Sequence, residues 1–337
     1  MQTYTRRGAA PTKIRTFWRF GSKRRLVARM EWLRLCPKAG PRPQLWQTFD
    51  IRPGSVAGAW RKGGAAERLM PNVLPIHPLT TGQVRIHDKM HRGEGTGLRR
   101  RAKVLRKGPM GELLPIHAWL IEHPEGLILV DAGETHVARS ATFAEFHVTR
   151  SDELDHQLKA ADVVPADVKT VVLTHIHGDH IDGLPHVPNA TVMADEREIA
   201  IANSPMGRLQ RTVARQPLPP NFDPQPITLD GPALGAFATS KALTADGRIV
   251  AVPTPGHTLG HIAILIVQPD HHVLLGGDTA YDQPQLQDLH VDGVSPKDDV
   301  AIATMKTILA HAEVHPTVYL PSHDPQSVRR LRETDTL

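Results

Sequence analysis

Four side chains near the middle of this 337-residue chain could together bind metal. His175, His177, Asp179 and His180 lie within six positions of one another, directly after a short apolar run. In an extended chain His175 and His177 point to the same face, so both can bind one ion. Gly178 permits a turn that brings Asp179 and His180 toward a second position. Imidazole and carboxylate groups are ligands for zinc and similar divalent metals.

Three more ligand-type residues follow apolar stretches downstream. His257 follows residues 249–252, Asp278 follows two glycines that allow close backbone approach, and His323 follows another short apolar segment. The chain has 20 histidines, so a lone one is more often a surface or core residue than a ligand. The clustered spacing favours a metal site, in which Asp278 can bridge two ions.

The order His-x-His-x-Asp-His, Gly-His, Asp, His resembles the metallo-β-lactamase superfamily of hydrolases. The similarity extends from about residue 113 to about residue 330 and includes a hairpin over residues 116–133. The resemblance implies an α/β fold, a four-layer αββα sandwich of two mixed β-sheets flanked by helices. It also implies two divalent metal ions, expected to be Zn²⁺. One would be held by His175, His177 and His257, the other by Asp179, His180 and His323, with Asp278 shared.

Several branches of that superfamily fit this chain less well. The diiron redox branch commonly carries Glu where this chain has His177. The β-lactamases with a Cys ligand do not match, because the only cysteine, Cys36, lies far upstream. No nuclease block or nucleic-acid clamp is recognisable after His323, so nucleic acid is not an expected partner. Zinc-dependent hydrolysis of a small-molecule substrate is favoured.

Tyr281, three residues after Asp278, distinguishes among the remaining hydrolases. In N-acyl-homoserine lactone lactonases a tyrosine stands at this position and its hydroxyl contacts the substrate carbonyl. Residues 115–122 and 126–131 are also similar to the first hairpin of that subfamily. The resemblance therefore implies a quorum-quenching lactonase that acts on acyl lactones. The alternative is that the Tyr281 ring packs in a loop.

The resemblance also implies a mechanism. A hydroxide that bridges the two metals would attack the lactone carbonyl, because metal coordination lowers the pKa of water from about 15.7 toward 7. Tyr281 would donate a hydrogen bond to the developing oxyanion, and Asp179 and Asp278 would hold and orient the reacting groups and relay the proton. Asp131 and Asp182 are candidate partners for the outer ring nitrogens of the ligands, with an ordinary turn carboxylate as the alternative for each.

Other histidines and other functions are weighed beside this hypothesis. We expect His261 to support the site or to start a strand, and His186 to be a solvated loop residue. A glyoxalase II-like thioesterase or another ester hydrolase is the alternative enzyme. A metal-binding or nucleic-acid-binding protein is the non-enzyme alternative, but it leaves the ligand set unexplained.

Charge divides the chain into two parts. Residues 1–69 carry 16 Lys and Arg against 3 Asp and Glu, although the whole chain has a net charge of only +5. We predict a basic, disordered N-terminal extension over residues 1–69 and the hydrolase domain over residues 70–337. A basic arm for acidic partners, an Arg-rich transit segment and a misplaced start before Met70 all remain open for the extension. The basic cluster at residues 98–103 is expected to be a solvated loop.

The chain lacks the roughly 18 consecutive apolar residues of a membrane span, so no membrane partner is expected. A single cysteine is consistent with a reducing compartment, and the expected location is the cytoplasm. The oligomeric state is left open, with a homodimer among the alternatives.

Short apolar runs and helical stretches alternate beyond residue 70. We predict helices with Ser151 and Ser295 as N-caps and Pro296 in the first helical position; they cover residues 151–160, 194–203 and 295–311. The predicted strands are residues 116–121, 127–131, 170–174, 190–193, 249–253, 262–267, 273–275 and 318–320. All seven ligands lie at the ends of such strands, on one rim of the sandwich. The Pro-rich residues 216–226 are predicted to form a loop that borders the substrate pocket.

Overall fold

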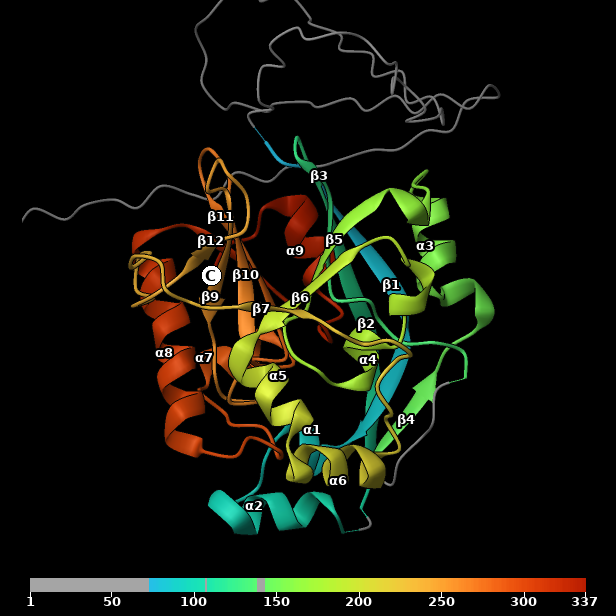
Figure 1. The fold of residues 1–337 in the computed structure, drawn as a ribbon. Coiled ribbons are helices and arrows are strands. Elements are labelled where there is room, and N and C mark those ends of the chain that lie inside the picture. The colour runs from blue at the N-terminus through green and yellow to red at the C-terminus, as the bar shows by residue number, and fades with distance from the viewer. Residues whose placement is uncertain (1–72, 107, 138–142) are drawn as a thin grey trace, which may run out of the picture. The chain divides into compact units, whose positions relative to one another are not determined.

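The computed structural model describes residues 73–106, 108–137 and 143–337 (Figure 1). The predicted N-terminal extension, Met70 and Cys36 lie outside the described residues. In the part that the structure describes, no helix is both long and apolar enough to cross a membrane.

The first sheet has seven strands in the order β4-β1-β2-β3-β5-β6-β7. Strands β1 to β4 pair in antiparallel fashion, whereas β3, β5, β6 and β7 run parallel, so the sheet is mixed. The strands are β1 (Ile76–His87), β2 (Met110–His123), β3 (Gly126–Val130), β4 (Ala144–His147), β5 (Val168–Val172), β6 (Thr191–Asp195) and β7 (Gln225–Ile227).

The second sheet has five strands in the order β12-β11-β10-β9-β8. It is also mixed, because β11 and β12 are parallel while the other neighbours are antiparallel. The strands are β8 (Lys241–Ala242), β9 (Ile249–Pro253), β10 (Ile262–Val267), β11 (His272–Gly277) and β12 (Thr317–Pro321).

Helices cover the outer face of each sheet. Leu154 and Leu158 pack on the first sheet from α3, and Met305 and Ile308 pack on the second from α8 (Figure 1). The helices are α1 (Asp88–His91), α2 (Gly97–Val104), α3 (Leu154–Ala160), α4 (Gly178–Ile181), α5 (Glu196–Asn203), α6 (Pro205–Ala214), α7 (Gln283–Gln287), α8 (Asp298–Val314) and α9 (Ser327–Glu333).

The main hydrophobic core lies between the two sheets. Trp119 and Val130 of the first sheet pack in one cluster with Ile264 and Leu275 of the second, and all four are almost fully buried. Burial of each such side chain stabilises the fold by roughly 1.5–3 kcal/mol before the entropy of ordering is subtracted. The layers are therefore helix, sheet, sheet and helix, and the predicted αββα sandwich is confirmed.

The predicted helix starts were wrong by a few residues. Helix α3 begins at Leu154, and Ser151 lies in a preceding 3₁₀ turn that Thr149 and Asp152 cap. Helix α5 begins at Glu196, because residues 194 and 195 pair with β7.

Helix α8 begins at Asp298, so neither Ser295 nor Pro296 opens it. The backbone of Ser295 is engaged elsewhere: its N–H donates to Asp292, and its carbonyl accepts from Arg100. The backbone groups of Ser295 thus tie two distant segments together instead of starting a helix.

The basic cluster at residues 98–103 lies in α2, so the expectation of a solvated loop was wrong. Arg100 is only 1% exposed, and its Nη1 lies 2.6 Å from a carboxylate oxygen of Asp298. This ion pair and the bond from Arg100 to the Ser295 carbonyl (2.5 Å) attach α2 to the start of α8.

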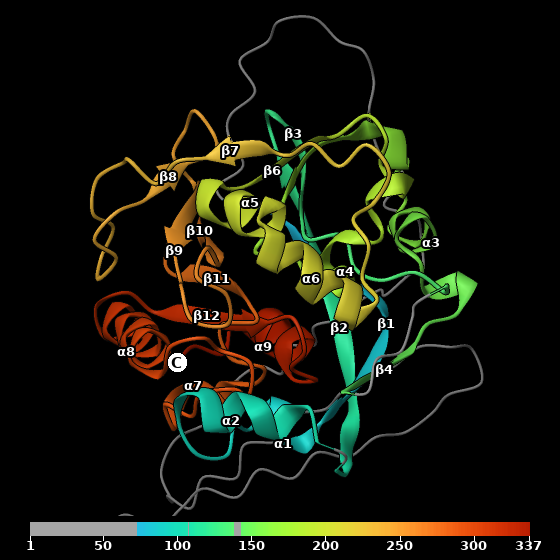
Figure 2. The same cartoon turned by 60° about the horizontal axis from the view of Figure 1, so that its bottom comes forward.

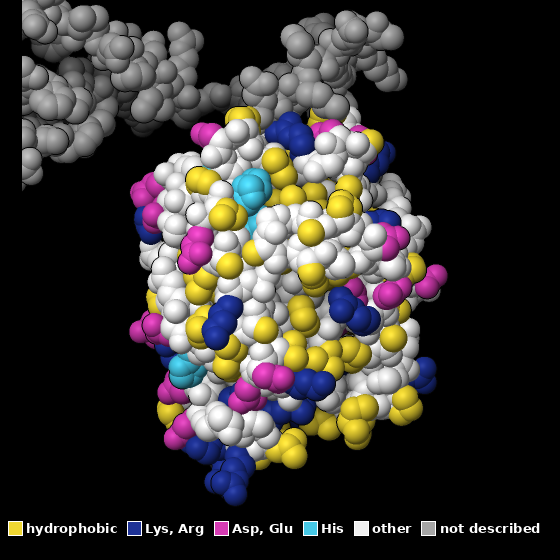
Figure 3. Space-filling view, turned by 90° about the vertical axis from the view of Figure 1, so that its left-hand side faces the viewer, with side chains coloured by type: hydrophobic (Ala, Val, Ile, Leu, Met, Phe, Trp, Pro, Cys, Tyr) yellow, Lys and Arg dark blue, Asp and Glu magenta, His cyan; other side chains and the backbone are white. Residues whose placement is uncertain are grey.

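The side of the molecule on which α8 lies has an ordinary solvated surface. Basic, acidic and hydrophobic side chains are interspersed over it (Figure 3). The loops that carry the candidate ligands follow β5, β9, β11 and β12. Figure 2 shows the sandwich from the end where α1, α2 and α6 come forward.

Candidate metal centre

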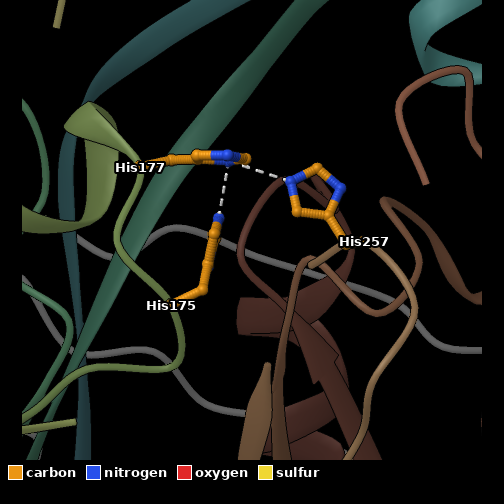
Figure 4. Close-up of side chains that lie close together, drawn as sticks. All are labelled: His175, His177 and His257. Atoms are coloured by element: carbon orange, nitrogen blue, oxygen red, sulfur yellow. Dashed lines mark hydrogen bonds between the residues drawn. The ribbon is translucent and has the colours of Figure 1, made fainter. Parts of the chain in front are cut away.

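Three histidines from the two sheets converge at the first candidate position. His175 Nε2 lies 2.9 Å from His177 Nδ1, and His257 Nε2 lies 3.0 Å from the same atom (Figure 4). His175 and His177 belong to the loop after β5, whereas His257 belongs to the loop after β9. All three offer ligand atoms within 4.8 Å of one another, which is close enough to bind a single ion.

A second group lies directly beside the first. Its members Asp179, His180 and His323 also have ligand atoms within 4.8 Å of one another. His323 Nε2 lies 3.4 Å from Asp179 Oδ2. The structure thus places these three predicted ligands together, although Asp179 and His180 lie far from His323 in sequence.

Asp278 lies between the two groups. Its Oδ1 is 3.3 Å from both His180 Nε2 and His323 Nε2, and its Oδ2 is 3.6 Å from His257 Nε2. One carboxylate therefore faces one histidine of the first group and two of the second. A carboxylate that bridges two ions would have to lie in such a position.

Gly277 fixes the approach to Asp278. Its φ is +52°, in the left-handed region that favours glycine. A Cβ at this position would lie 2.7 Å from His261 Nε2 and 2.8 Å from Thr174 Oγ1, too close for either atom. The second of the two glycines before Asp278 therefore allows the close packing of three ligand-bearing loops.

Each of three ligand imidazoles has a fixed partner for its outer ring nitrogen. His180 Nδ1 lies 2.8 Å from Asp131 Oδ2, and His257 Nδ1 lies 2.9 Å from Asp292 Oδ2. His323 Nδ1 donates to the carbonyl of Pro115 at 2.9 Å. Such partners fix the tautomer, so that Nε2 is left free for a metal.

Asp131 thus contacts the outer ring nitrogen of a candidate ligand, which is one of the two alternatives given for it in the sequence analysis. Asp182 lies beside buried Glu134, and burial together with Asp182 raises the pKa of Glu134 to about 9. Asp292 was missed. It lies in an irregular turn before α8, and no local motif marks it.

His261 supports the site through both ring nitrogens. Its Nε2 accepts the backbone N–H of Asp278 at 3.1 Å, and its Nδ1 lies 2.8 Å from Thr254 Oγ1. Burial and neighbouring His257 lower the pKa of His261 to about 3, so the ring is neutral and can accept. His261 thus fixes the backbone of Asp278 and has no nitrogen left for a metal.

The expectation that His186 is solvated was wrong. Its Nε2 lies 3.1 Å from Glu153 Oε2, and its Nδ1 lies 3.5 Å from Asp155 Oδ1. Glu153 is almost fully buried and also pairs with His136 and Arg150. A buried carboxylate requires such partners, which the sequence around His186 did not reveal.

The protonation states of the metal-free centre differ among its histidines. Burial opposes protonation of His180, His257 and His323, but neighbouring aspartates outweigh it and raise the pKa of each. Burial and His257 lower the pKa of His177 to about 4, and burial and His180 lower that of His175 further below its usual value, so both rings are neutral. Burial opposes ionisation of Asp278, but His323 and His180 outweigh it and hold the pKa well below the usual range. Neutral imidazole and ionised carboxylate are the metal-binding forms.

Two buried atoms at the centre lack hydrogen bonds. His180 Nε2 and Asp278 Oδ1 have no hydrogen-bond partner among the described residues, and both face the other ligand atoms. The two atoms lie 3.3 Å from each other without forming a hydrogen bond, and a buried polar atom without a hydrogen bond costs free energy. Divalent metal ions would satisfy both, so the donor set of five histidines and two aspartates fits the expected ions.

Tyr281 lies against both groups of ligands. Its ring centroid is 5.8 Å from that of His257 and 5.5 Å from that of His323. The side chain is 2% exposed and packs with Ile86 and Ile116, yet its hydroxyl has no hydrogen-bond partner among the described residues. The ring is therefore packed, as expected if Tyr281 has a structural role, and it also lies beside the proposed metal site.

Residues 111–323 match the family model described as the metallo-beta-lactamase superfamily. The chain belongs to this superfamily. This is a metal-dependent hydrolase superfamily, and the αββα fold with the His and Asp clusters agrees with that membership.

Individual relatives of this superfamily member are similar at modest identity. N-acyl homoserine lactonase AttM of Agrobacterium fabrum is 26% identical over 232 residues, which cover 64% of this chain and 83% of AttM. A probable metallo-hydrolase of Mycobacterium tuberculosis is 29% identical over 268 residues, 74% of this chain and 77% of that protein. A solved N-acyl homoserine lactone hydrolase with N-hexanoyl-L-homoserine at its metal centre aligns with a TM-score of 0.59 and 19% identity, over 76% of this chain and 96% of that one.

The Pro-rich loop after α6 borders the first ligand loop. A Cβ on Gly178 would lie 3.1 Å from the side chain of Gln216, so the two segments are in contact. A surface cavity of about 670 Å³ lies beside this loop; it is lined by Asn203, Arg208, Arg211, Thr212, Arg215, Pro217 and Leu218. None of the seven predicted ligands lines it, so this cavity is separate from the metal centre.

Proposed function

We propose that this protein is a dimetal hydrolase, with zinc as the expected metal, that opens the lactone ring of N-acyl-homoserine lactones and so quenches quorum signals. The observation that carries the proposal is the position of Tyr281. Its ring faces His257 of one ligand group and His323 of the other, and its buried hydroxyl has no hydrogen-bond partner among the described residues. The names of AttM and of the similar solved structure support the same substrate class.

The ligand assignment is part of the proposal. His175, His177 and His257 would hold one ion, Asp179, His180 and His323 the other, and Asp278 both. When bound, two such ions supply a water whose pKa falls from about 15.7 toward 7, and they polarise the carbonyl.

Tyr281 is the residue we assign to the substrate carbonyl. Burial and Asp278 raise the pKa of Tyr281 well above its usual value. The hydroxyl therefore stays protonated and can donate a hydrogen bond. Donation to the carbonyl oxygen strengthens as negative charge develops there, which stabilises the transition state more than the ground state.

Asp179 is the residue we assign to the proton. Its side chain is 13% exposed, and its Oδ2 faces His323. A water oxygen bonds to the lactone carbonyl carbon while Asp179 accepts a proton from that water. The ring C–O bond then breaks, and the proton passes to the departing alkoxide, so the product is the open hydroxy acid.

A substrate panel tests the proposal. Metal-loaded protein is offered short-chain and long-chain N-acyl-homoserine lactones, a glutathione thioester and a β-lactam, and kcat/KM is measured for each. We expect the highest value for a lactone. Brisk thioester cleavage without lactone opening would favour the glyoxalase II-like alternative, and metal binding without hydrolysis of any substrate would favour the non-enzyme alternative.

A further inference from the structure

The two loops that carry the first ligand group come from different sheets. His175 and His177 follow β5 of the first sheet, and His257 follows β9 of the second. For the three rings to share one ion, the two loops must be held at a fixed separation.

Glu198 makes the connection between these loops. It is the third residue of α5 and is 3% exposed. Its Oε1 accepts the backbone N–H of Ile176 at 3.3 Å, and its Oε2 accepts the hydroxyl of Thr258 at 2.8 Å. Ile176 lies between His175 and His177, and Thr258 follows His257 directly. One carboxylate thus bonds to both ligand loops.

The backbone of the second loop also lies close to Glu198. A Cβ on Gly260 would lie 2.4 Å from the backbone nitrogen of Glu198, so only glycine allows this approach. In Figures 1 and 2, α5 lies between α4 and the ends of β9 and β10, consistent with a helix that joins the two loops. A buried carboxylate is costly unless it is hydrogen-bonded, and here its hydrogen bonds go to these loops.

We propose that Glu198 is a positioning residue that joins the two loops and so sets the geometry of the three-histidine metal site without binding metal itself. The second group has supports that do not involve Glu198, namely Asp131 behind His180 and the Pro115 carbonyl behind His323. Loss of the Glu198 carboxylate therefore weakens one metal site selectively. This inference concerns the metal centre and holds whichever substrate the centre acts on.

Cobalt(II) titration of the apoprotein tests the proposal without any substrate. The two binding steps are followed by visible absorption and by calorimetry, in wild type and in Glu198→Gln. Glutamine keeps the size of the side chain but replaces one acceptor oxygen with a donor. We expect about 10- to 100-fold weaker binding in one step, as for other residues that orient metal ligands, and the other step within about twofold of wild type.

Two further variants separate positioning from general stability. Thr258→Val removes one of the two contacts at nearly constant volume, and it should weaken the same step by a smaller factor. Thr258→Val also tests the proposal if Glu198→Gln does not fold. Glu196→Gln is the matched control, since Glu196 is exposed on the same helix and its carboxylate binds Thr228. Equal weakening of both steps, or no change in either, in Glu198→Gln and Thr258→Val would overturn the proposal.

Discussion

His257 Nδ1 lies 2.9 Å from Oδ2 of Asp292, a residue that no sequence motif marks. The other oxygen of Asp292 accepts the backbone N–H groups of Val294 and Ser295, at 2.7 and 2.6 Å. The backbone of its own turn therefore holds the Asp292 carboxylate in the orientation in which it contacts the imidazole. The contact directs His257 Nε2 toward His177 and the proposed ion.

Replacement of Asp292 should weaken metal binding. In Asp292→Ala the His257 ring loses the partner that fixes its tautomer, and we expect about 10- to 100-fold lower zinc affinity, measured by competition with a chromogenic chelator. Asp288→Ala is the control, because Asp288 is exposed and forms an ion pair with Arg92, which is not a candidate ligand. If both variants bind zinc as wild type does, Asp292 has no orienting role.

The Tyr281→Phe substitution should lower turnover and leave metal content unchanged. The hydroxyl is buried without a hydrogen bond among the described residues, so its removal should not destabilise the fold. The loss of one hydrogen-bond donor to the oxyanion should reduce kcat for the lactone by about 10²-fold. Kinetics, metal analysis and a thermal melt are measured on the same sample. Unchanged kcat would leave Tyr281 with its packing role alone.

The ion pair between Arg100 and Asp298 predicts an asymmetry in stability. Arg100 is 1% exposed on its side chain and Asp298 is 24% exposed, so removal of the aspartate leaves a charge buried while removal of the arginine does not. Asp298→Ala should cost about 3–5 kcal/mol of the free energy of unfolding, and Arg100→Met clearly less. Urea unfolding measures both. Equal costs would contradict the burial argument.

A histidine cluster far from the metal centre predicts acid sensitivity. His311 is fully buried; its Nε2 lies 2.9 Å from His272 Nδ1, and its ring lies 4.9 Å from that of His315. Burial and then His272 lower the pKa of His311 to about 4. Between these two pKa values His311 binds a proton in the unfolded chain but not in the folded chain. The free energy of unfolding therefore decreases as the pH falls from about 6.5 to 4.

The expected size of this effect is about 2 kcal/mol between pH 7.5 and pH 5. In His311→Leu this part of the loss should disappear, whereas His156→Leu, on an exposed residue, should behave as wild type. Chemical unfolding of metal-free protein at several pH values gives the comparison. An acid dependence that is identical in wild type and His311→Leu would refute the assignment.

Elements with a strong local signal were predictable from the sequence. β9 (Ile249–Pro253) and β10 (Ile262–Val267) have the predicted bounds, because both are continuous apolar runs that are buried on both faces. The seven ligand-type residues were found for a related reason, since each follows such a run. The structure places all seven at one centre.

Elements that depend on distant partners were not predictable. β1 (Ile76–His87) contains Pro and Gly among polar residues and forms through its long pairing with β2. Helix α2 owes its position to the Arg100–Asp298 pair, and Asp292 is recognisable only once its turn meets His257. Such contacts join residues that are far apart in the chain, so no local pattern of apolar or capping residues predicts them.

Titration of the metal-free protein with zinc, with lactone hydrolysis followed at each addition, tests the central claim most directly. Our prediction is no ring opening without metal, a rate that rises until two equivalents are bound, and a plateau beyond that point. Ring opening by metal-free protein, a plateau at one equivalent, or no hydrolysis of an N-acyl-homoserine lactone at any metal content would contradict it.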